Sequence, residues 1–404
     1  MAAPTQLLSI QRSGTLLARQ GILAAGCRPQ AAPPASRPSP FVIHGRGGIS
    51  PVRYPSLMLA ADAAPVVGQR GETEYLDLPC RSALNRCTSD RMPFRWTINP
   101  YRGCEFGCTY CYARYTHEFM GMDDSRLFET RIFAKQGAAE ALERDLPPGK
   151  IPDGAIAIGT VTDPYQPVER KLKVTRSILE VLARREGLTL SITTKGALIT
   201  RDIDLLLEIA RRNTLTINIT ITTLSRKLSR MLEGRAPRPA KRLEALRSLT
   251  SAGLRAGVFI MPVIPAITDG AAALEAIVAA ASRAGASYVA CQALFLRSSA
   301  RKEFYPFLDA SFPKLAPRLK RIYGANVYYT SDYRERLSVL FRKLQVKYGF
   351  APRSGRWDPG ASSNGERRLR RTGGGAGAAG GASRASRSRT VTHLIDRLQM
   401  PLAF

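Results

Sequence analysis

An alternation between strand-like and helix-like runs begins at about residue 85, and it constrains the fold more than any other feature. Six runs rich in Ile, Val and Thr cover residues 94–100, 154–162, 188–195, 214–224, 255–264 and 286–296. Runs with helical spacing separate them, at residues 134–146, 171–187, 201–213, 238–253 and 270–285. Such runs are typical of buried parallel strands joined by helices. Six units, where a closed barrel has eight, predict an α/β fold with a partial (β/α)6 barrel. A doubly wound open sheet is the alternative, because one sequence does not reveal strand order.

Composition changes at both ends of the chain. We expect residues 1–70 to be a disordered or leader segment, 85–300 the barrel, 301–350 a helical extension, and 351–404 a disordered basic tail rich in Gly, Ala, Ser and Arg. The start of the chain is Arg-bearing and free of acids, as an organelle transit peptide over residues 1–40 would be. A bacterial leader or an early start codon explains it equally well. We therefore expect a bacterial cytoplasmic protein, with an organelle as the alternative.

The net charge is +28 and the pI is about 10.4, far from the usual balance. Residues 1–61 contribute +6 and residues 351–404 contribute +7, which leaves +15 for the middle of the chain. The middle is therefore basic in its own right. This charge favours a polyanionic partner, nucleic acid before membrane. A GC-rich genome that encodes Arg and Ala frequently is the other explanation.

Two further features bear on location. No run of about 18 apolar residues occurs, so we expect no membrane span. The seven cysteines are odd in number and unevenly placed, which makes a poor disulfide framework and suits a reducing compartment.

Three cysteines lie within the stretch "GCEFGCTYCYAR", residues 103–114. Cys104, Cys108 and Cys111 have the spacing C-x3-C-x2-C, and thiolates bind soft metals such as zinc and the iron of iron–sulfur clusters. Structural zinc requires four ligands. A fourth would have to come from one of Cys80, Cys87 and His117. A [4Fe–4S] cluster held by three thiolates would leave one iron open for a substrate or cofactor.

The motif resembles that of the radical S-adenosylmethionine (SAM) superfamily, because it is followed by an aromatic residue and lies in the loop after the first barrel strand. Four stretches are similar more narrowly to the spore photoproduct lyase-like branch, also labelled DNA repair photolyase-like: "NPYRGCEFGCTYCYAR", "GTVTDPYQPVERKL", "SITTKGALITRDIDLL" and "LEGRAPRPAKRLEAL". The resemblance covers about residues 90–300.

The resemblance implies a chemistry. Three thiolates would hold the cluster, and SAM would chelate its open iron and be cleaved reductively to a 5′-deoxyadenosyl radical. It implies Cys104, Cys108 and Cys111 as ligands, and a reductant such as flavodoxin or ferredoxin. It also places Tyr112 beside the cluster and the adenine, and Tyr110 in radical transfer. For Tyr110, a plain core or surface tyrosine is the alternative.

Polar residues at strand ends are the expected SAM contacts, because ligands bind at the carboxyl ends of parallel strands. Thr162 and Asp163 would bond the SAM amino group or ribose, although an Asp before Pro164 also forms turns. Lys195 matches a lysine of the branch that contacts the SAM carboxylate.

The fourth strand and the loop after it carry further candidates. Asn218, Thr220 and Thr222 share one face of the strand. We expect this stripe to line the cavity, with Asn218 and Thr220 near the ribose, whereas a polar layer is the alternative. In the next loop, Arg235 beside Glu233 suits carboxylate binding, and an exposed salt bridge is the competing interpretation.

One departure from the branch matters. Spore photoproduct lyase uses a cysteine at the end of the second strand as its hydrogen donor. This chain has no cysteine between Cys111 and Cys291, so reversal of a thymine lesion by that mechanism is not expected.

The final residues, Gln399–Phe404, read "QMPLAF" and follow the basic tail. They resemble the short peptide by which bacterial repair proteins dock on the DNA sliding clamp. A frayed or packed terminus is the alternative.

The leading hypothesis is a radical SAM enzyme that acts on nucleic acid, in the manner of DNA repair. A second is a radical SAM enzyme that modifies a protein or small molecule. A third, of another class, is a metal-bearing nucleic-acid-binding module without catalysis.

Overall fold

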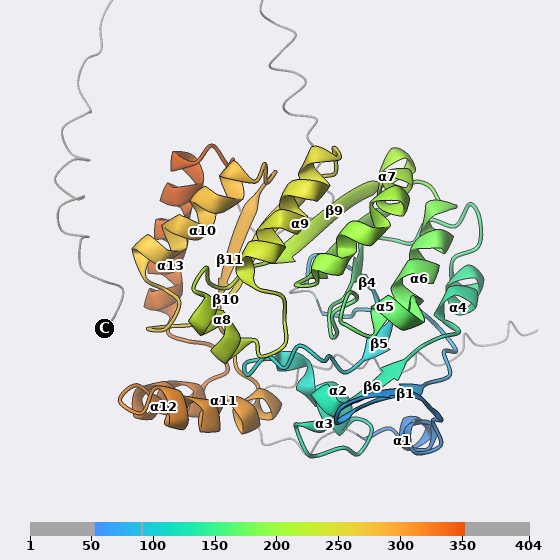
Figure 1. The fold of residues 1–404 in the computed structure, drawn as a ribbon, viewed down its shortest axis with the longest axis horizontal. Helices are drawn as coiled ribbons and strands as arrows, with labels where there is room; N and C mark the ends of the chain where they lie inside the picture. The colour runs from blue at the N-terminus through green and yellow to red at the C-terminus, as the bar shows by residue number, and fades with distance from the viewer. Residues whose placement is uncertain (1–52, 90–91, 352–404) are drawn as a thin grey trace, which may run out of the picture. The chain divides into compact units, whose positions relative to one another are not determined.

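The computed structural model describes residues 53–89 and 92–351. The expectations for residues 1–52 and 352–404, including the clamp peptide at Gln399–Phe404, lie outside the described residues. The larger sheet has seven strands in the order β11-β10-β9-β8-β7-β4-β3 (Figure 1). These strands are β3 (Leu84–Arg86), β4 (Trp96–Ile98), β7 (Ile156–Ile158), β8 (Thr189–Thr194), β9 (Thr214–Thr220), β10 (Ala256–Val263) and β11 (Val289–Ala293).

Six of these strands, β4 and β7 to β11, run parallel, and each lies beside its predecessor in the chain. The order of these six described strands never reverses, so they contain no switch point of the kind that defines a doubly wound sheet. The helices after the strands cover the outer face (Figure 1). They are α4 (Ala138–Asp145), α6 (Val174–Ala183), α7 (Ile203–Arg212), α9 (Pro239–Ser251) and α10 (Ala271–Arg283). The predicted partial (β/α)6 barrel is confirmed.

The two faces of the barrel strands differ in chemistry, because successive side chains point to opposite sides. The outer face carries aliphatic residues that are buried against the helices: Leu190, Ile192, Ile217, Ile219, Val258 and Ile260. The inner face carries small and polar residues in matching register, Ser191, Thr193, Thr216, Asn218 and Gly257, together with the aromatic Phe259. The outer face therefore supplies the core, and the inner face is free to supply polar groups.

A second, four-stranded sheet has the order β1-β2-β6-β5. Its strands are β1 (Val66–Arg70), β2 (Thr73–Asp77), β5 (Tyr101–Arg102) and β6 (Arg131–Ala134), and helix α1 (Pro55–Asp62) precedes it. The expectation of disorder over residues 1–70 is therefore wrong for residues 55–70. This segment is ordered by tertiary contacts, since β1 pairs with β2 and Ala61 packs in a small core with Met120 and Met122.

The C-terminal helices share the core of the barrel. They are α11 (Ser298–Ser311), α12 (Ala316–Ala325) and α13 (Ser331–Lys347). Helix α13 covers the edge strand β11, and the Gln345 side chain donates a hydrogen bond to the Val289 carbonyl at 3.0 Å.

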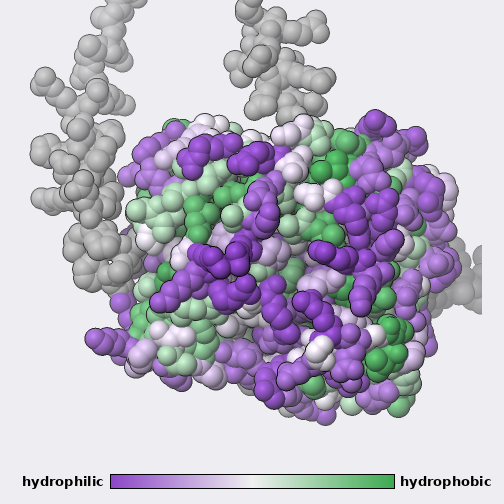
Figure 2. Space-filling view, in the orientation of Figure 1, coloured by the Kyte–Doolittle hydropathy of each residue, from purple (hydrophilic) through white to green (hydrophobic). Residues whose placement is uncertain are grey.

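Hydrophilic side chains dominate the face drawn in Figure 2, with smaller apolar patches between them. In the described part of the chain, no helix combines the length and apolar character needed to cross a membrane.

Candidate iron–sulfur and cofactor site

The three motif cysteines lie in one loop after β4 and β5, just before the short 3-10 helix η1 (Tyr112–Arg114). All three are free thiols. Cys108 is buried, and Cys104 and Cys111 are half-buried. Burial raises the pKa of each thiol, for Cys108 to about 12. Without a bound cation these thiols would stay protonated, whereas a metal would hold them as thiolates.

Backbone pairing fixes the loop against the segment that follows helix α8 (Arg226–Leu232). The Thr109 amide donates to the Leu232 carbonyl at 3.0 Å, and the Arg235 amide donates to the Phe106 carbonyl at 3.0 Å. Gly107 has φ of +61°, and a Cβ there would lie 2.3 Å from a Glu129 carboxylate oxygen. The positive φ favours glycine at this position, whereas the Glu129 carboxylate ends a flexible side chain that could move away.

Arg114 supports the loop from within. Its guanidinium donates to the Cys108 carbonyl at 3.1 Å and to the Ser125 carbonyl at 2.7 Å, and it pairs with Glu129 at 3.2 Å. Arg235 pairs with the other Glu129 oxygen at 3.0 Å, and its side chain is 45% exposed. The structure thus shows Arg235 in the exposed salt bridge that was the competing interpretation.

Tyr110 points into a buried polar cluster. Its hydroxyl donates to Glu233 Oε1, which also accepts from the Thr222 hydroxyl at 2.9 Å. Arg242 donates to Glu233 Oε2, and both members of this ion pair are almost fully buried. Burial alone would raise the pKa of Glu233, but the Arg242 and Lys195 cations outweigh it and hold that pKa below its ordinary value. Glu233 is therefore a carboxylate that fixes Tyr110 beside Cys108.

Lys195 follows β8 and joins the same cluster. Its ammonium lies 5.8 Å from the centroid of the Tyr110 ring. Cys108 and Glu233 raise its pKa against the effect of burial. Among the expected SAM contacts, Lys195 is thus close to the cysteine loop.

Tyr112 contacts a different part of the barrel from Tyr110. Its hydroxyl donates to the Thr160 carbonyl at the end of β7, and its ring centroid is 5.2 Å from that of Phe295. The tyrosine therefore links the cysteine loop to the strand ends of the barrel.

Thr162 and Asp163 bond to the protein itself. The Thr162 hydroxyl donates to the Gly103 carbonyl at 2.6 Å, immediately before Cys104. Asp163 accepts from the Tyr165 amide at 2.9 Å, from the Lys195 amide at 2.7 Å and from the Thr194 hydroxyl. Asp163 therefore forms the turn before Pro164 that was the alternative, and it also joins the ends of β7 and β8.

Asn218 belongs to a packed polar layer. Its amide donates to the Ser191 hydroxyl at 2.9 Å, the Ile192 carbonyl at 3.1 Å and the Thr193 hydroxyl at 3.0 Å, and its oxygen accepts from Tyr288 at 2.6 Å. Asn218 has no exposed surface. The expectation that it lines the cavity near the ribose is wrong, because every polar atom of the amide is used within the sheet.

The rest of the predicted stripe is also buried. Thr220 is 4% exposed, and Thr222 faces Glu233. On the neighbouring strand, a Cβ on Gly257 would lie 2.5 Å from Tyr288, so the glycine provides the space that the tyrosine needs to reach Asn218. The stripe therefore forms part of the structure beneath the site.

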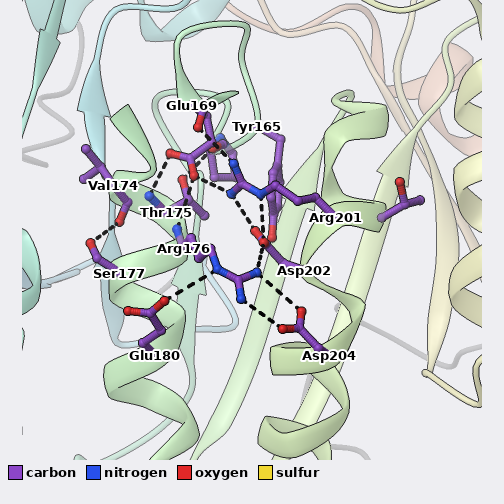
Figure 3. A network of polar contacts seen from close by, with 12 residues as sticks. Tyr165, Glu169, Val174, Thr175, Arg176, Ser177, Glu180, Arg201, Asp202 and Asp204 are labelled. Carbon is purple, nitrogen blue, oxygen red and sulfur yellow. Dashed lines mark hydrogen bonds and ion pairs between the residues drawn. The ribbon is translucent and has the colours of Figure 1, made fainter. Parts of the chain in front are cut away.

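Two of the stretches that carry the family resemblance contact each other through a network of ion pairs (Figure 3). They are "GTVTDPYQPVERKL", which contains Glu169, and "SITTKGALITRDIDLL", which contains Arg201 and Asp202. Glu169 accepts from Arg201 at 2.7 Å and from the Tyr101 hydroxyl at 2.5 Å. Asp202 pairs with Arg201 at 2.8 Å and with Arg176 at 2.7 Å. Since Tyr101 lies three residues before Cys104, this network helps to set where the cysteine loop begins.

Several residues of the site were not predicted from the sequence. Arg242 and Gln166 are the clearest examples: Gln166 accepts from the Glu105 amide at 2.9 Å and donates to the Gly103 carbonyl at 3.3 Å. Both lie inside stretches that were noted only as family resemblance. The stretch "EGRAPRPAKR" places three arginines after Glu233, and the sequence does not show that Arg242 is the buried one that pairs with it.

Zinc and iron–sulfur clusters place different demands on a set of thiolate ligands. Within residues 53–89 and 92–351, no three His, Cys, Asp or Glu side chains converge where one metal ion could sit. A single zinc ion needs all its thiolates at about 2.3 Å from one point. An iron–sulfur cluster spreads its thiolates over separate irons, so three free thiols in one rigid loop fit a cluster better.

His117 is not placed to complete a zinc site. Its Nε2 lies 3.0 Å from the Arg131 carbonyl, and its ring contacts those of Phe128 and Phe133. Burial lowers its pKa to about 3, so it is a neutral core histidine.

Comparisons with known proteins agree with this geometry. A sequence model of the radical SAM superfamily matches residues 98–276, which include the cysteine loop and strands β7 to β10. An uncharacterized protein of Mycobacterium tuberculosis is 34% identical over 278 residues, 69% of this chain and 82% of that protein. An uncharacterized protein of Methanocaldococcus jannaschii is 30% identical over 223 residues, 54% of this chain and 77% of that protein. The chain belongs to the radical SAM superfamily.

Solved structures give a more distant likeness. A spore photoproduct lyase complexed with dinucleoside spore photoproduct has a TM-score of 0.48 and 15% identity, over 70% of this chain and 85% of that one. Streptococcus suis SuiB bound to S-adenosylmethionine has a TM-score of 0.33 and 14% identity, over 55% of this chain and 44% of that one.

Proposed function

We propose that this protein is a radical SAM enzyme that binds a [4Fe–4S] cluster through Cys104, Cys108 and Cys111 and acts on nucleic acid. The observation that carries the proposal is the loop itself. Three free thiols lie within eight residues, and the loop is fixed by backbone pairing to Leu232 and Arg235. A rigid loop with three donors suits a cluster whose fourth iron stays open.

The bound cluster and SAM would supply a carbon-centred radical that removes a hydrogen atom from an unactivated C–H bond. The chain's own residues would orient the cofactor and exclude water. Lys195 is the residue we assign to the SAM carboxylate, since it is close to Cys108 and Tyr110. Tyr112 is assigned to packing beside the cofactor, because its hydroxyl is fixed at Thr160 and its ring remains half-buried.

Other predicted cofactor contacts take a supporting role in this proposal. Thr162 and Asp163 hold the cysteine loop and the β8 end in place through their hydrogen bonds. Tyr110 remains our candidate for radical transfer. Glu233 accepts the hydrogen bond that the Tyr110 hydroxyl donates.

Nucleic acid is the proposed substrate class. The charge of +15 on residues 62–350 and the similarity of four stretches to the spore photoproduct lyase-like branch support it. The chain lacks the hydrogen-donor cysteine of that branch, so we propose a repair-like reaction other than thymine-lesion reversal by that route. A flavodoxin or ferredoxin would supply the electron. We retain the bacterial cytoplasm as the compartment, since the seven unevenly placed cysteines make a poor disulfide framework.

Anaerobic reconstitution tests the proposal. We expect a brown protein with about four irons per chain that cleaves SAM to 5′-deoxyadenosine when reduced. Cys108→Ala should lose iron and cleavage together, whereas Cys291→Ala, a matched change outside the loop, should keep both. A colourless wild-type protein with stoichiometric zinc would favour a binding module and reject an enzyme. Product analysis with a protein substrate in place of DNA tests the second hypothesis.

A further inference from the structure

Two cations on the small sheet, the buried Lys135 and the half-buried Arg102, have no acidic partner among the described residues. Arg102 in β5 lies opposite Phe133 in β6, and Lys135 follows that strand, with its amide bonded to the Pro100 carbonyl at 3.1 Å. Residues two apart on a strand share a face, so Arg102 and Lys135 are diagonal neighbours, about 7–8 Å apart.

The Lys135 side chain and the Nε atom of Arg102 are withdrawn from water. Lys135 is only 9% exposed, and the Nε atom of Arg102 is buried without a hydrogen-bond partner. Arg131, on the same face, pairs with Glu74 at 3.5 Å. Among the described residues, no carboxylate hydrogen-bonds or pairs with Arg102 or Lys135. A buried charge without a partner is strongly unfavourable, so such a pair is unexpected unless an anion binds there.

Electrostatic effects place the two cations near each other. Burial, and to a lesser extent the nearby Arg102 cation, lower the pKa of Lys135 to about 8. The thiol of Cys80 lies near both. This is the pattern of an electropositive site that no group of the protein neutralises.

A third cation adjoins the site from the C-terminal part of the chain. The Arg297 guanidinium lies 5.0 Å from the centroid of the Tyr115 ring and forms no ion pair among the described residues. Burial raises the pKa of Tyr115 to about 12, while Arg297 and Arg102 both oppose the rise. The Tyr115 hydroxyl therefore lies within the field of both arginines.

We propose that Arg102, Lys135 and Arg297 form a binding site for a phosphate group of the substrate, beside the cysteine loop. Arg102 lies two residues before Cys104, and Tyr115 lies four residues after Cys111. Three cations without a carboxylate match a phosphate, which carries one negative charge as a diester within a strand and accepts several hydrogen bonds. The inference rests on the proposed function in one respect: the phosphate belongs to a nucleic-acid strand.

Lys135→Met in the full-length reconstituted protein, with SAM present, tests the site. The control is Lys227→Met, which removes the same charge from an exposed position on α8. The readout is the anisotropy of a labelled single-stranded oligonucleotide at about 50 mM salt and above. We expect Lys135→Met to weaken binding about tenfold. The salt slope of log K should decrease by about 0.7, the value for one phosphate contact on a single strand. The control should change affinity much less.

Thermal stability separates a binding role from a structural one. Lys135→Met should unfold at a higher temperature than wild type when no oligonucleotide is present, because the variant no longer buries an unpaired charge. A lower melting temperature would mean that Lys135 supports the fold, and the inference would fail. A raised KM for SAM in the cleavage assay would assign the site to the cofactor and would also overturn it.

Inorganic phosphate distinguishes the source of the anion and separates the two proposals. If wild type binds the oligonucleotide but Lys135→Met and Lys227→Met bind it equally, the phosphate site is wrong and the proposed function stands. If wild type binds no oligonucleotide, while inorganic phosphate raises its melting temperature and not that of Lys135→Met, the site stands and the nucleic-acid function fails. If neither ligand has an effect on wild type, both fail.

Discussion

Two buried groups of charges lie near the cysteine loop, and they differ in how they are neutralised. In the network of Figure 3, Arg201 and Arg176 lie against Glu169 and Asp202, so each cation has carboxylates within hydrogen-bond distance. On the small sheet, Arg102 and Lys135 have none among the described residues. Cations that pair with carboxylates of the same chain stabilise the fold. Cations that lack a carboxylate partner are unfavourable in the free protein, and they indicate a place where an anionic ligand would bind.

The largest expected effect is on the matched network. Arg201→Met removes the cation between Glu169 and Asp202, both fully buried, and should lower the free energy of unfolding by about 3–5 kcal/mol. Denaturant titration measures it. Arg211→Met, which breaks only an exposed pair with Glu208, should cost less than about 1 kcal/mol. Equal effects would mean that the network is not a structural element.

The unmatched site should respond to pH in the opposite sense to a salt bridge. The pKa of Lys135 is about 8 in the folded state, against an unfolded value of about 10.4, so the unfolded chain binds more protons between these values. Stability should therefore rise with pH from about 8 to 10.4, by about 3 kcal/mol from this group. Since other groups titrate there, the quantity to compare is wild type minus Lys135→Met at each pH. A flat difference would contradict an unpaired buried lysine.

The sequence predicts a region well when the pattern that identifies it lies within a short stretch of the chain, and poorly when tertiary contacts define it. The six βα units were predictable because buried parallel strands have long aliphatic runs, and the cysteine loop because its spacing is contained in eight residues. The small sheet was missed because β1, "VVGQR", is mostly exposed and carries no such run. The charge groups were not predictable, since Arg102 and Arg201 look alike in sequence and only tertiary contacts distinguish them.

Asn218 shows the same limit within one strand. Alternation placed its side chain on the inner face correctly, but only the structure shows that Ser191, Thr193 and Tyr288 use every polar atom of its amide. Asn218→Ala should lower stability by about 1–3 kcal/mol, because it leaves these partners unsatisfied. The KM for SAM should not change. A rise in KM without loss of stability would restore a cofactor role.

The smallest expected effect is at Arg235. Its salt bridge with Glu129 is nearly half-exposed, so Arg235→Gln should cost less than about 1 kcal/mol and leave the iron content unchanged. Chemical denaturation and an iron assay on the reconstituted variant measure both. Loss of iron would show that the loop depends on this exposed pair as well as on Arg114.

The central claim is that three thiolates hold a cluster with one iron left for SAM. Electron paramagnetic resonance of the reduced, reconstituted protein tests this most directly. We expect the cluster signal to change when SAM is added, because SAM would bind the open iron, and Lys195→Met to require more SAM for the same change. A signal that is identical with and without SAM would contradict an open iron, and with it the proposed chemistry.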